Sequence, residues 1–339
     1  MPTSPRPEGA PTVRGEAVRG EAVRGRAAEG EEVAPGEAAG GARAGYLGPE
    51  GTFSEEALLA SGAPGALEPV PLATIYDTIT AVRDGEVEWA IVPIENSLDG
   101  SITVTLDALA EEAEDLGIVG ETLLPVRHAL IAAQAVALGE IEEVASHPQV
   151  FGQCTRFLRE QLPRARLVPA SSTAVAVREL SAGGGARAGA RRGAIGTALA
   201  ARIYHAHVIA ENVQDRDDNE TRFIWLSRRA RGRAREAPLR EEARVGRRWK
   251  TSLVFWGPGA DRAGWLVRCL DEFARREINL TKIESRPRRE RMGHYMFFVD
   301  LEGGEQEAAV AEALAGLRAR CEAVRVLGSY RAAAPPGGG

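Results

Sequence analysis

The sequence is poor in cysteine and histidine, which argues against a protein held together by disulfides and against a metal-binding protein. Its 339 residues include three cysteines, Cys154, Cys269 and Cys321, which lie far apart and form no CxxC pair. We therefore expect a reducing, cytoplasmic environment and no disulfide framework. The closest histidines, His205 and His207, are two residues apart and would face different ways on a helix, so no metal site is expected.

Long apolar runs and net positive charge are also missing. No run approaches the ~20 apolar residues that a transmembrane helix needs, and the N-terminus lacks the apolar core of a signal peptide. The formal charge of -6 argues against nucleic acid as the main partner. What remains is a globular balance, 44% hydrophobic and 27% charged, in a chain long enough for two ordinary domains.

Composition divides the chain into segments. Residues 1–43 are rich in Gly, Ala, Glu, Arg and Pro and have little to bury, which predicts a disordered low-complexity tail. Residues 228–249 contain nine arginines without a periodic apolar face. They are predicted to form a linker, since the overall charge makes a nucleic-acid-binding arm the weaker alternative. Residues 331–339 are predicted to be a flexible tail. The two segments in between, 44–227 and 250–330, carry the periodic patterns of folded domains.

The segment 44–227 alternates between strands and helices. Ala44–Leu47, Trp89–Val92 and Ile118–Pro125 are predicted strands with helical patterns between them, and such alternation favours an α/β sheet. The turn Gly48–Ser54 opens a helix, whose free backbone N–H groups can bind an anion. It is not a Walker loop, because no lysine follows at the required spacing.

Small hydroxyl and amide side chains recur where predicted strands end. Ligand contacts in open α/β sheets lie at these ends. Each such residue alone is more often a helix cap than a ligand group. Together they suit a cleft that binds carboxylates through neutral donors. These residues are Thr52, Asn96, Ser97, Ser172, Thr173 and Thr221.

The stretch Asp215–Phe223 combines three useful groups. It is acidic and ends on Thr221, Arg222 and Phe223, just before a strand-like run. A hydroxyl, a fixed cation and an apolar face in consecutive residues suit a small anionic substrate with a leaving oxygen. The alternative is an ordinary acidic loop that enters a strand.

The segment 250–330 has the order βαββαβ, which is the ferredoxin-like arrangement. Its helices are marked by Leu266, Leu270 and Phe273 and by Val310, Leu314 and Leu317. The predicted strands are Thr251–Trp256, Asn279–Arg286, Tyr295–Leu301 and Val324–Tyr330.

Several motifs in series resemble known families. Residues 44–227 resemble prephenate dehydratase, and residues 250–330 resemble the ACT regulatory domain attached to that enzyme. The first resemblance rests on Gly48–Ser54, Pro93–Ser97, Ser146–Gln149 with Gln153 and Cys154, Ser172–Ala174 and Asn219–Phe223. The second rests on Asp261–Gly264, Asn279 with Leu280, and Glu284–Pro287.

The resemblance implies an α/β catalytic domain with two lobes, like a type II periplasmic binding protein, followed by the ferredoxin-like ACT domain. Lobe one would comprise residues 44–121 and 208–227, and lobe two residues 122–207, with the cleft between them. A monofunctional enzyme is expected, because the low-complexity tail cannot supply a helical chorismate mutase domain.

The implied reaction converts prephenate to phenylpyruvate in phenylalanine biosynthesis. Aromatisation drives the loss of carbon dioxide and water, so no cofactor is expected. The resemblance makes Thr221 the catalytic residue, which we interpret as a hydrogen-bond donor to the departing oxygen. Arg222 would bind a carboxylate, and Phe223 would pack on the ring or lie in the core. The other expected substrate contacts are Thr52, Asn96, Ser97, Gln153, Ser172 and Thr173, with His147 and Glu95 as candidates for a proton relay.

The ACT resemblance implies feedback by L-phenylalanine bound at a subunit interface, and hence a homo-oligomer, dimer or tetramer, held through ACT and catalytic domains. The expected effector contacts are Gly264, Leu266, Asn279, Leu280, Glu284, Ser285, Arg286 and Pro287. Trp265 stands where the family usually has alanine. It could point into the effector pocket, change which amino acid fits, or lie on the outer face.

Two other functions remain open on the sequence. One is arogenate dehydratase, which would form phenylalanine directly. The other is a non-catalytic amino-acid-binding regulator, which the presence of Thr221–Phe223 disfavours.

Overall fold

A computed structural model describes residues 41–182, 191–230, 233–240, 248–258, 262–289 and 292–333. Most of the predicted N-terminal tail, much of the predicted linker and most of residues 331–339 lie outside these ranges. The predicted motif residue Asp261 also lies outside them. No described helix combines the length and the hydropathy that a membrane span requires.

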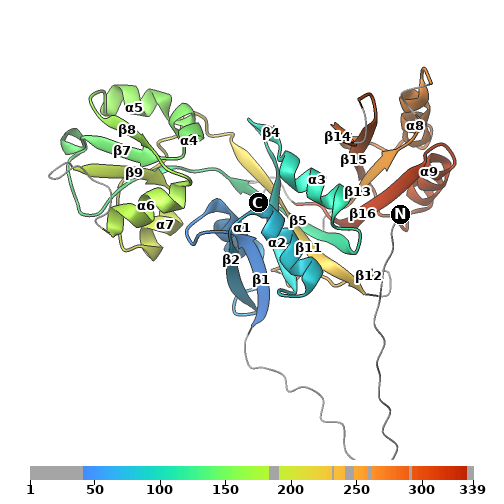
Figure 1. The fold of residues 1–339 in the computed structure, drawn as a ribbon, viewed down its shortest axis with the longest axis horizontal. Helices are drawn as coiled ribbons and strands as arrows, with labels where there is room; N and C mark the ends of the chain where they lie inside the picture. The colour runs from blue at the N-terminus through green and yellow to red at the C-terminus, as the bar shows by residue number, and fades with distance from the viewer. Residues whose placement is uncertain are drawn as a thin grey trace, which may run out of the picture. The chain divides into compact units, whose positions relative to one another are not determined.

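The first sheet has seven strands in the order β12-β11-β3-β1-β2, with β4 paired to β3 and β5 paired to β11 (Figure 1). β1, β2 and β3 are parallel, whereas β11 runs antiparallel to both β3 and β5. The strands are β1 (Ala42–Leu47), β2 (Leu67–Leu72), β3 (Trp89–Asn96), β4 (Gly100–Ser101), β5 (Leu116–Pro125), β11 (Glu220–Ala230) and β12 (Arg233–Ala234). β12 lies within the segment that was predicted to be a linker.

Helices cover both faces of this sheet. Its strands alternate, so that Trp89, Ile91 and Trp225 pack with α1 (Phe53–Ser61) on one face. Ala90, Val92 and Ile224 face the other side, with α2 (Ile75–Asp84) and α3 (Thr103–Glu111). The carboxyl ends of β1 and β2 are each followed by the N-terminus of a helix, α1 and α2 respectively.

Strand β2 is absent from the sequence predictions. Pro69 and Pro71 argue against a strand because proline has no N–H to donate to a ladder. β2 is the last strand of the order and pairs only with β1, so one of its edges needs no such donors. Pro69 and Pro71 are two residues apart, so their backbone nitrogens point to the same side of β2. Their lack of N–H groups is therefore compatible with a strand at the edge of the sheet.

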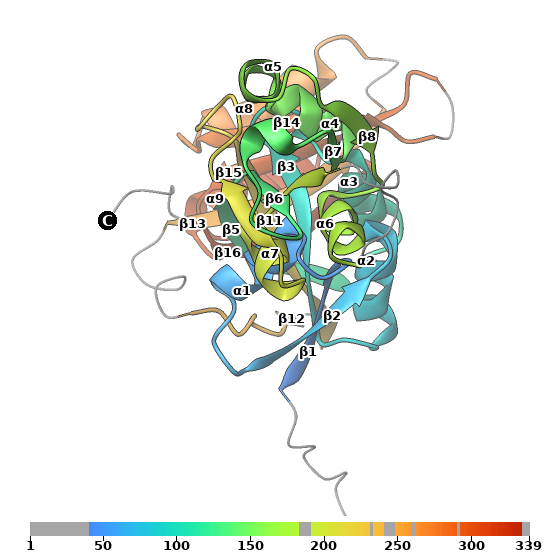
Figure 2. The same ribbon diagram turned by 90° about the vertical axis from the view of Figure 1, so that its left-hand side faces the viewer.

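The second sheet has five strands in the order β10-β6-β9-β7-β8 and is brought to the front in Figure 2. Its strands are β6 (Ala129–Ala132), β7 (Glu143–Ser146), β8 (Arg166–Pro169), β9 (Arg192–Gly196) and β10 (His207–Ala210). The associated helices are α4 (Pro148–Gln153), α5 (Thr155–Gln161), α6 (Thr173–Ser181) and α7 (Ala198–Ile203). A single turn, η1 (Leu138–Glu140), follows β6.

The boundary predicted between the lobes at residue 208 is wrong. β10 pairs antiparallel with β6 of the second sheet, so the chain returns to the first sheet only after Ala210. The apolar run Val208–Ala210 predicts a strand but does not indicate which of the two sheets the strand joins.

The C-terminal part confirms the order βαββαβ, with strands arranged β14-β15-β13-β16. Helices α8 and α9 cover one face, where Phe255, Phe273 and Leu314 are buried. The other face packs on lobe one, since Val254 and Phe298 share a core cluster with Ile94 and Ile118. The elements are β13 (Trp249–Trp256), α8 (Trp265–Ala274), β14 (Leu280–Pro287), β15 (Tyr295–Glu302), α9 (Ala308–Arg318) and β16 (Ala323–Arg331).

Candidate functional site

The centre of the candidate site is a pair of neighbouring strand ends. β3 and β11 are paired so that Asn96 lies opposite Thr221. The side-chain Nδ2 of Asn96 donates to Thr221 Oγ1 at 3.0 Å. The same nitrogen lies 2.9 Å from Asn219 Oδ1 and 3.1 Å from the carbonyl oxygen of Glu220, so its two hydrogens are shared among three acceptors. The structure thus brings together two residues that are 125 positions apart and were both predicted for the site.

The orientation of the Asn96 amide is fixed from both ends. Its Oδ1 accepts from the backbone N–H groups of Leu98 at 2.9 Å and Asp99 at 3.0 Å. An amide flipped by 180° would set its NH₂ against two backbone donors, so the NH₂ must face Thr221. Thr221 Oγ1 is therefore an acceptor toward Asn96, and its own hydroxyl hydrogen remains to be donated elsewhere.

Ser97 and Thr52 are at the strand ends but are fully engaged within the protein. Ser97 Oγ donates to the carbonyl of Asp218 at 3.2 Å and accepts from Glu220 N at 3.0 Å. Thr52 caps α1, because its Oγ1 accepts from Glu55 N at 3.4 Å and donates to the carbonyl of Leu47 at 2.8 Å. Their hydroxyls shape the loops at the site and have no hydrogen left for a ligand.

Ser172 and Thr173 begin α6 in the second lobe. Ser172 caps the helix by accepting from Val175 N at 3.1 Å, which leaves its hydroxyl hydrogen available. Thr173 is buried in the first turn of the helix. Of the predicted hydroxyl donors, Ser172 and Thr221 are therefore the best placed to donate to a ligand.

Gln153 takes part in a cluster that joins the two lobes. Gln149 Nε2 on α4 donates to Asp99 Oδ2 at 2.5 Å, and Gln153 Nε2 lies 3.4 Å from the same oxygen. Gln153 Oε1 accepts from His128 Nε2 at 2.9 Å. Gln153 thus reaches the turn that follows Asn96, as its inclusion in the predicted site requires.

His128 is a member of this cluster that the sequence did not reveal. Its ring is buried and stands edge-on to Phe53, with centroids 5.4 Å apart. Burial lowers the pKa of His128 below its ordinary value, although the hydrogen bond to Gln153 opposes this. The imidazole is therefore neutral at pH 7, and its Nδ1 has no partner among the described residues. A histidine at the start of a strand carries no sequence signal of such a role.

The two predicted proton-relay residues lie in different surroundings. His147 is half-buried at the N-terminus of α4, directly before Pro148. Glu95 is on the side of β3 opposite to Asn96, with its Oε1 2.9 Å from Lys282 Nζ and its Oε2 3.5 Å from Arg222 Nη1. Its carboxylate is ion-paired with two cations, which corrects the prediction that it delivers protons to the cleft.

The prediction that Arg222 binds a substrate carboxylate is also wrong. Its guanidinium is buried and donates through Nε to Glu121 at 2.7 Å, through Nη1 to Asp300 at 2.5 Å and through Nη2 to Tyr330 Oη at 2.8 Å. The reason is the two-residue period of a strand, which sends Arg222 to the opposite face from Thr221. Phe223 is 1% exposed and belongs to the α1-side core, which settles its two predicted alternatives in favour of the core.

Burial does not neutralise Arg222 or its partner Asp300. Burial by itself lowers the pKa of Arg222, but Tyr330, Asp300 and Glu121 raise it well above the ordinary value. Burial by itself raises the pKa of Asp300, but Arg222 and Ser252 bring it below the ordinary value. The pair is therefore ionised at neutral pH.

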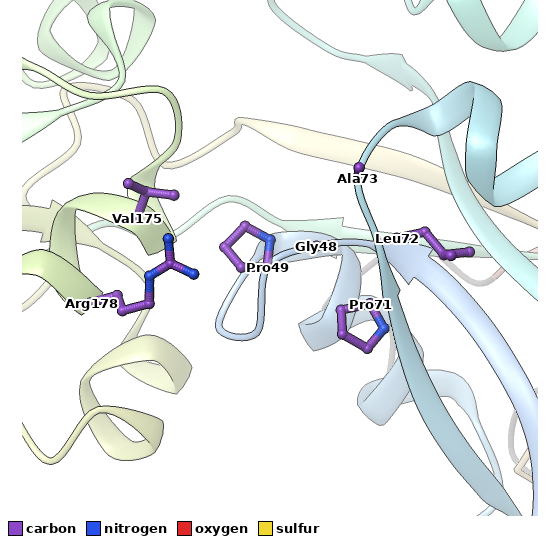
Figure 3. A pocket seen from close by; sticks show the side chains of 7 residues that line it. All are labelled: Gly48, Pro49, Pro71, Leu72, Ala73, Val175 and Arg178. Atoms are coloured by element: carbon purple, nitrogen blue, oxygen red, sulfur yellow. The ribbon is translucent and has the colours of Figure 1, made fainter.

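A cavity of about 350 Å³ lies at the carboxyl ends of β1 and β2, facing α6 (Figure 3). Its walls are mostly apolar, and Arg178 is the cation among them, with its guanidinium beside Pro49. The lining residues are Gly48, Pro49, Pro71, Leu72, Ala73, Val175 and Arg178.

A second cavity, of about 560 Å³, lies in the C-terminal domain around the start of α8. Gly264 and Leu266 line it, as predicted for the effector site. Trp265 also lines it, but is 5% exposed and donates from Nε1 to the carbonyl of Arg320 at 2.9 Å. The outer-face alternative for Trp265 is thereby excluded.

The remaining predicted effector residues divide between two sides of β14. Ser285 and Pro287 are exposed, while Glu284 accepts from Ser101 Oγ at 3.2 Å. Arg286 binds Asp107 of α3 through two hydrogen bonds, at 3.0 and 2.8 Å. Glu284 and Arg286 thus contact lobe one, which corrects their predicted place around the effector. Asn279 and Leu280 lie at the start of β14.

Comparison with known families now decides the identity of the chain. The family model described as "Prephenate dehydratase" matches residues 44–231, and the model described as "ACT domain" matches residues 259–319. The chain belongs to the prephenate dehydratase family. As a member it is a carbon–oxygen lyase, and its C-terminal part is an ACT domain.

Individual relatives agree over most of the chain. A prephenate dehydratase of Mycobacterium sp. (strain JLS) is 42% identical over 308 residues, which cover 87% of this chain and 91% of that protein. The crystal structure of a prephenate dehydratase from Arthrobacter aurescens in complex with L-Phe is 38% identical, with a TM-score of 0.73, and the match covers 85% of this chain and 90% of that one. GqqA, described as a novel type of quorum quenching acylase, is 29% identical, with a TM-score of 0.71 and coverage of 87% and 98%.

Proposed function

We propose that this protein converts prephenate to phenylpyruvate beside the Asn96–Thr221 hydrogen bond. The observation that carries the proposal is the direction of that bond. Asn96 occupies an acceptor position of Thr221 Oγ1, so the hydroxyl hydrogen of the threonine is left to donate to a ligand. Two residues that the family resemblance assigns to the site are thus held in one donor arrangement.

The chemistry needs such a donor at the leaving oxygen. The carbon–carbon bond to the ring carboxylate breaks and releases carbon dioxide. Its electron pair shifts through the ring as the carbon–oxygen bond to the ring hydroxyl breaks, which leaves an aromatic ring. The departing oxygen takes the charge of hydroxide and becomes water on gaining a proton. A hydroxyl is too weak an acid to lose its proton outright at neutral pH, so Thr221 stabilises the departing oxygen by a preorganised hydrogen bond.

The substrate carries two carboxylates, which neutral donors and a cation can bind. Ser172 offers a hydroxyl hydrogen, and the N-terminus of α6 offers backbone N–H groups. Arg178, which follows further along α6, supplies a guanidinium at the 350 Å³ cavity. We assign the carboxylate role predicted for Arg222 to these groups on α6.

Incubation of the purified protein with prephenate, followed by the absorbance of phenylpyruvate in alkali, tests the proposal directly. Arogenate, assayed by the release of phenylalanine, is the parallel substrate. Preferential turnover of arogenate would replace the proposal by arogenate dehydratase. If the protein bound amino acids but turned over neither compound, it would be a non-catalytic regulator.

We further propose that L-phenylalanine binds the ACT domain and regulates turnover. Support comes from the 560 Å³ cavity lined by Gly264 and Leu266, and from the L-Phe complex of the Arthrobacter aurescens relative. Calorimetric titration with phenylalanine, tyrosine and tryptophan tests this, and no heat of binding from any of the three would reject it.

We propose that the protein is cytoplasmic and that it assembles as a homo-oligomer. Exposed apolar side chains on the ACT domain favour self-association, including Val267 at 69%, Ile283 at 48% and Tyr295 at 44% exposure. Cys269 and Cys321 are free thiols although their sulfurs lie 3.7 Å apart, which fits a reducing compartment. Sedimentation equilibrium would reject the assembly if the protein remained monomeric at micromolar concentration.

A further inference from the structure

The residues next to the two central site residues face the ACT domain. β3 and β11 are paired so that Arg222 lies opposite Glu95, just as Thr221 lies opposite Asn96. Because side chains alternate along a strand, Asn96 and Thr221 face one way and their neighbours Glu95 and Arg222 face the other. Each member of the proposed donor pair is therefore one peptide unit away from a charged side chain on the ACT side.

Both of these charged side chains are bound by residues of the ACT sheet. Asp300 on β15 binds Arg222 Nη1 at 2.5 Å, and Lys282 on β14 binds Glu95 Oε1 at 2.9 Å. Arg222 and Glu95 also pair with each other at 3.5 Å. The result is one line of alternating charges, Lys282–Glu95–Arg222–Asp300, which crosses both strands.

The side chains of Arg222, Asp300 and Lys282 in this line are buried, the Glu95 carboxylate is 36% exposed, and the ends of the line are fixed by further contacts. Asp300 Oδ1 accepts from Ser252 Oγ at 2.5 Å, and Ser252 Oγ lies 2.7 Å from Tyr330 Oη. Lys282 Nζ donates to Ser101 Oγ of β4 at 2.7 Å. Only 5% of the surface of Asp300 and 2% of that of Tyr330 are exposed. Buried charges that are paired in this way hold their geometry firmly, because any displacement leaves a charge without compensation.

We propose that Asp300 and Lys282 of the ACT sheet are positioning residues for the Asn96–Thr221 hydrogen bond. They act through Arg222 and Glu95 and do not touch the substrate. Catalysis by a preorganised hydrogen-bond donor is sensitive to shifts of a fraction of an ångström. When Arg222 and Glu95 lose their partners on the ACT side, the ends of β3 and β11 can shift, and Asn96 and Thr221 on the opposite face lose their alignment. This inference rests on the proposed function of Thr221.

Asp300→Asn is the decisive variant, since it removes the charge and keeps the shape. We expect kcat for prephenate to fall about ten- to a hundredfold with KM changed less than about threefold, because alignment and not binding is lost. Asp107→Asn is the matched control. Asp107 is also a buried carboxylate at the contact with the ACT domain, bound by Arg286 and Arg289, but it lies on α3 away from the strand ends. Its kcat should stay within about twofold of wild type.

Lys282 is tested by a pair of substitutions. Lys282→Met removes the charge that holds Glu95 and should lower kcat, whereas Lys282→Arg retains a cation and should restore most of it. If Lys282→Met turned over prephenate like the wild type, the role of Lys282 would be rejected.

Hydrogen exchange supplies a readout that does not need activity. Peptides that cover residues 93–97 and 219–223 should exchange faster in Asp300→Asn than in wild type, and should be unchanged in Asp107→Asn. Unchanged exchange together with unchanged kcat in Asp300→Asn would overturn the inference while leaving the proposed function intact. If wild-type protein did not turn over prephenate, the proposed function would fail, and hydrogen exchange would still decide whether Asp300 holds these strand ends.

Discussion

Thr221 and Arg222 are adjacent in the sequence, but their side chains point to opposite faces of β11. The hydroxyl of Thr221 is oriented by Asn96 and left with a hydrogen to donate. The guanidinium of Arg222 points the other way, to Glu121, Asp300 and Tyr330. The strand thus divides a motif that was predicted to bind one ligand into a proposed catalytic residue, Thr221, and a structural residue, Arg222.

Removing the Thr221 hydroxyl should abolish most of the turnover. We expect Thr221→Val, which keeps the shape, and Thr221→Ala to lower kcat by about 10²–10⁴-fold while the protein stays folded. Steady-state kinetics with prephenate measures the loss, and circular dichroism checks the fold. Turnover near the wild-type rate in either variant would contradict the role of Thr221.

The neutral state of His128 makes stability depend on pH. Burial lowers the pKa of His128 in the folded protein, so the unfolded chain binds the proton more readily. Its contribution is fully present above the unfolded pKa of about 6.5 and is lost as the pH falls from there toward the folded pKa.

His128→Gln keeps an N–H donor for Gln153 and does not titrate. Between pH 5 and pH 8, the free energy of unfolding from guanidinium titrations should fall less steeply toward acid in this variant than in wild type. Equal slopes for the two proteins would show that His128 does not titrate on unfolding.

At the scale of elements, β16 of the ACT domain packs closely against β5 of lobe one. A Cβ at Gly328 would lie 2.1 Å from the carbonyl oxygen of Ile118, so only glycine fits there. Gly328→Ala should lower the free energy of unfolding by about 1–3 kcal/mol through overpacking. Gly139→Ala, where nothing lies within 4 Å of the new Cβ, is the control and should stay within about 0.5 kcal/mol. Equal denaturation midpoints for the two variants would refute this.

Elements with a local signature could be predicted from the sequence, and contacts between distant residues could not. The helix that begins at Thr173 has a capping serine and an apolar period, and the βαββαβ order of the ACT domain follows from local patterns. β2 was missed because proline opposes a strand unless the strand lies at an edge, and edge position is not a local property.

The same distinction applies to the candidate site, where single residues could be predicted but their contacts could not. Motif residues such as Asn96 and Thr221 could be named from the sequence, but their hydrogen bond joins positions 125 apart. The partners that Arg222 donates to, Glu121, Asp300 and Tyr330, lie 101, 78 and 108 positions away. No pattern of spacing indicates which charges will pair over such separations, so a buried ion pair was read as a ligand contact.

At the scale of the whole molecule, the ACT domain meets lobe one on one sheet face and carries its own cavity near α8. Trp265 forms part of the wall of that cavity and packs against both Phe255 and Phe297, which stack on each other. We expect its bulk to limit the size of the amino acid that this cavity accepts.

Trp265→Phe should enlarge the cavity without emptying the core. We expect the affinity for tyrosine and tryptophan to rise relative to phenylalanine by about tenfold, the usual effect of relieving a contact in an apolar pocket. Calorimetric titrations of wild type and variant with the three amino acids measure the ratio. An unchanged ratio would show that Trp265 does not set the preference.

The position of β11 has a consequence for how the protein emerges from the ribosome. All five strands of the second sheet fall within residues 129–210, so this lobe can form as soon as that stretch has been translated. The first sheet begins earlier in the chain but is completed later, since β11, which pairs with both β3 and β5, is followed in this sheet only by the two-residue β12 among the described strands. Nascent chains shorter than about 230 residues thus expose one unpaired edge on β3 and one on β5. At this stage of synthesis the chain is most prone to misfold and most in need of chaperones.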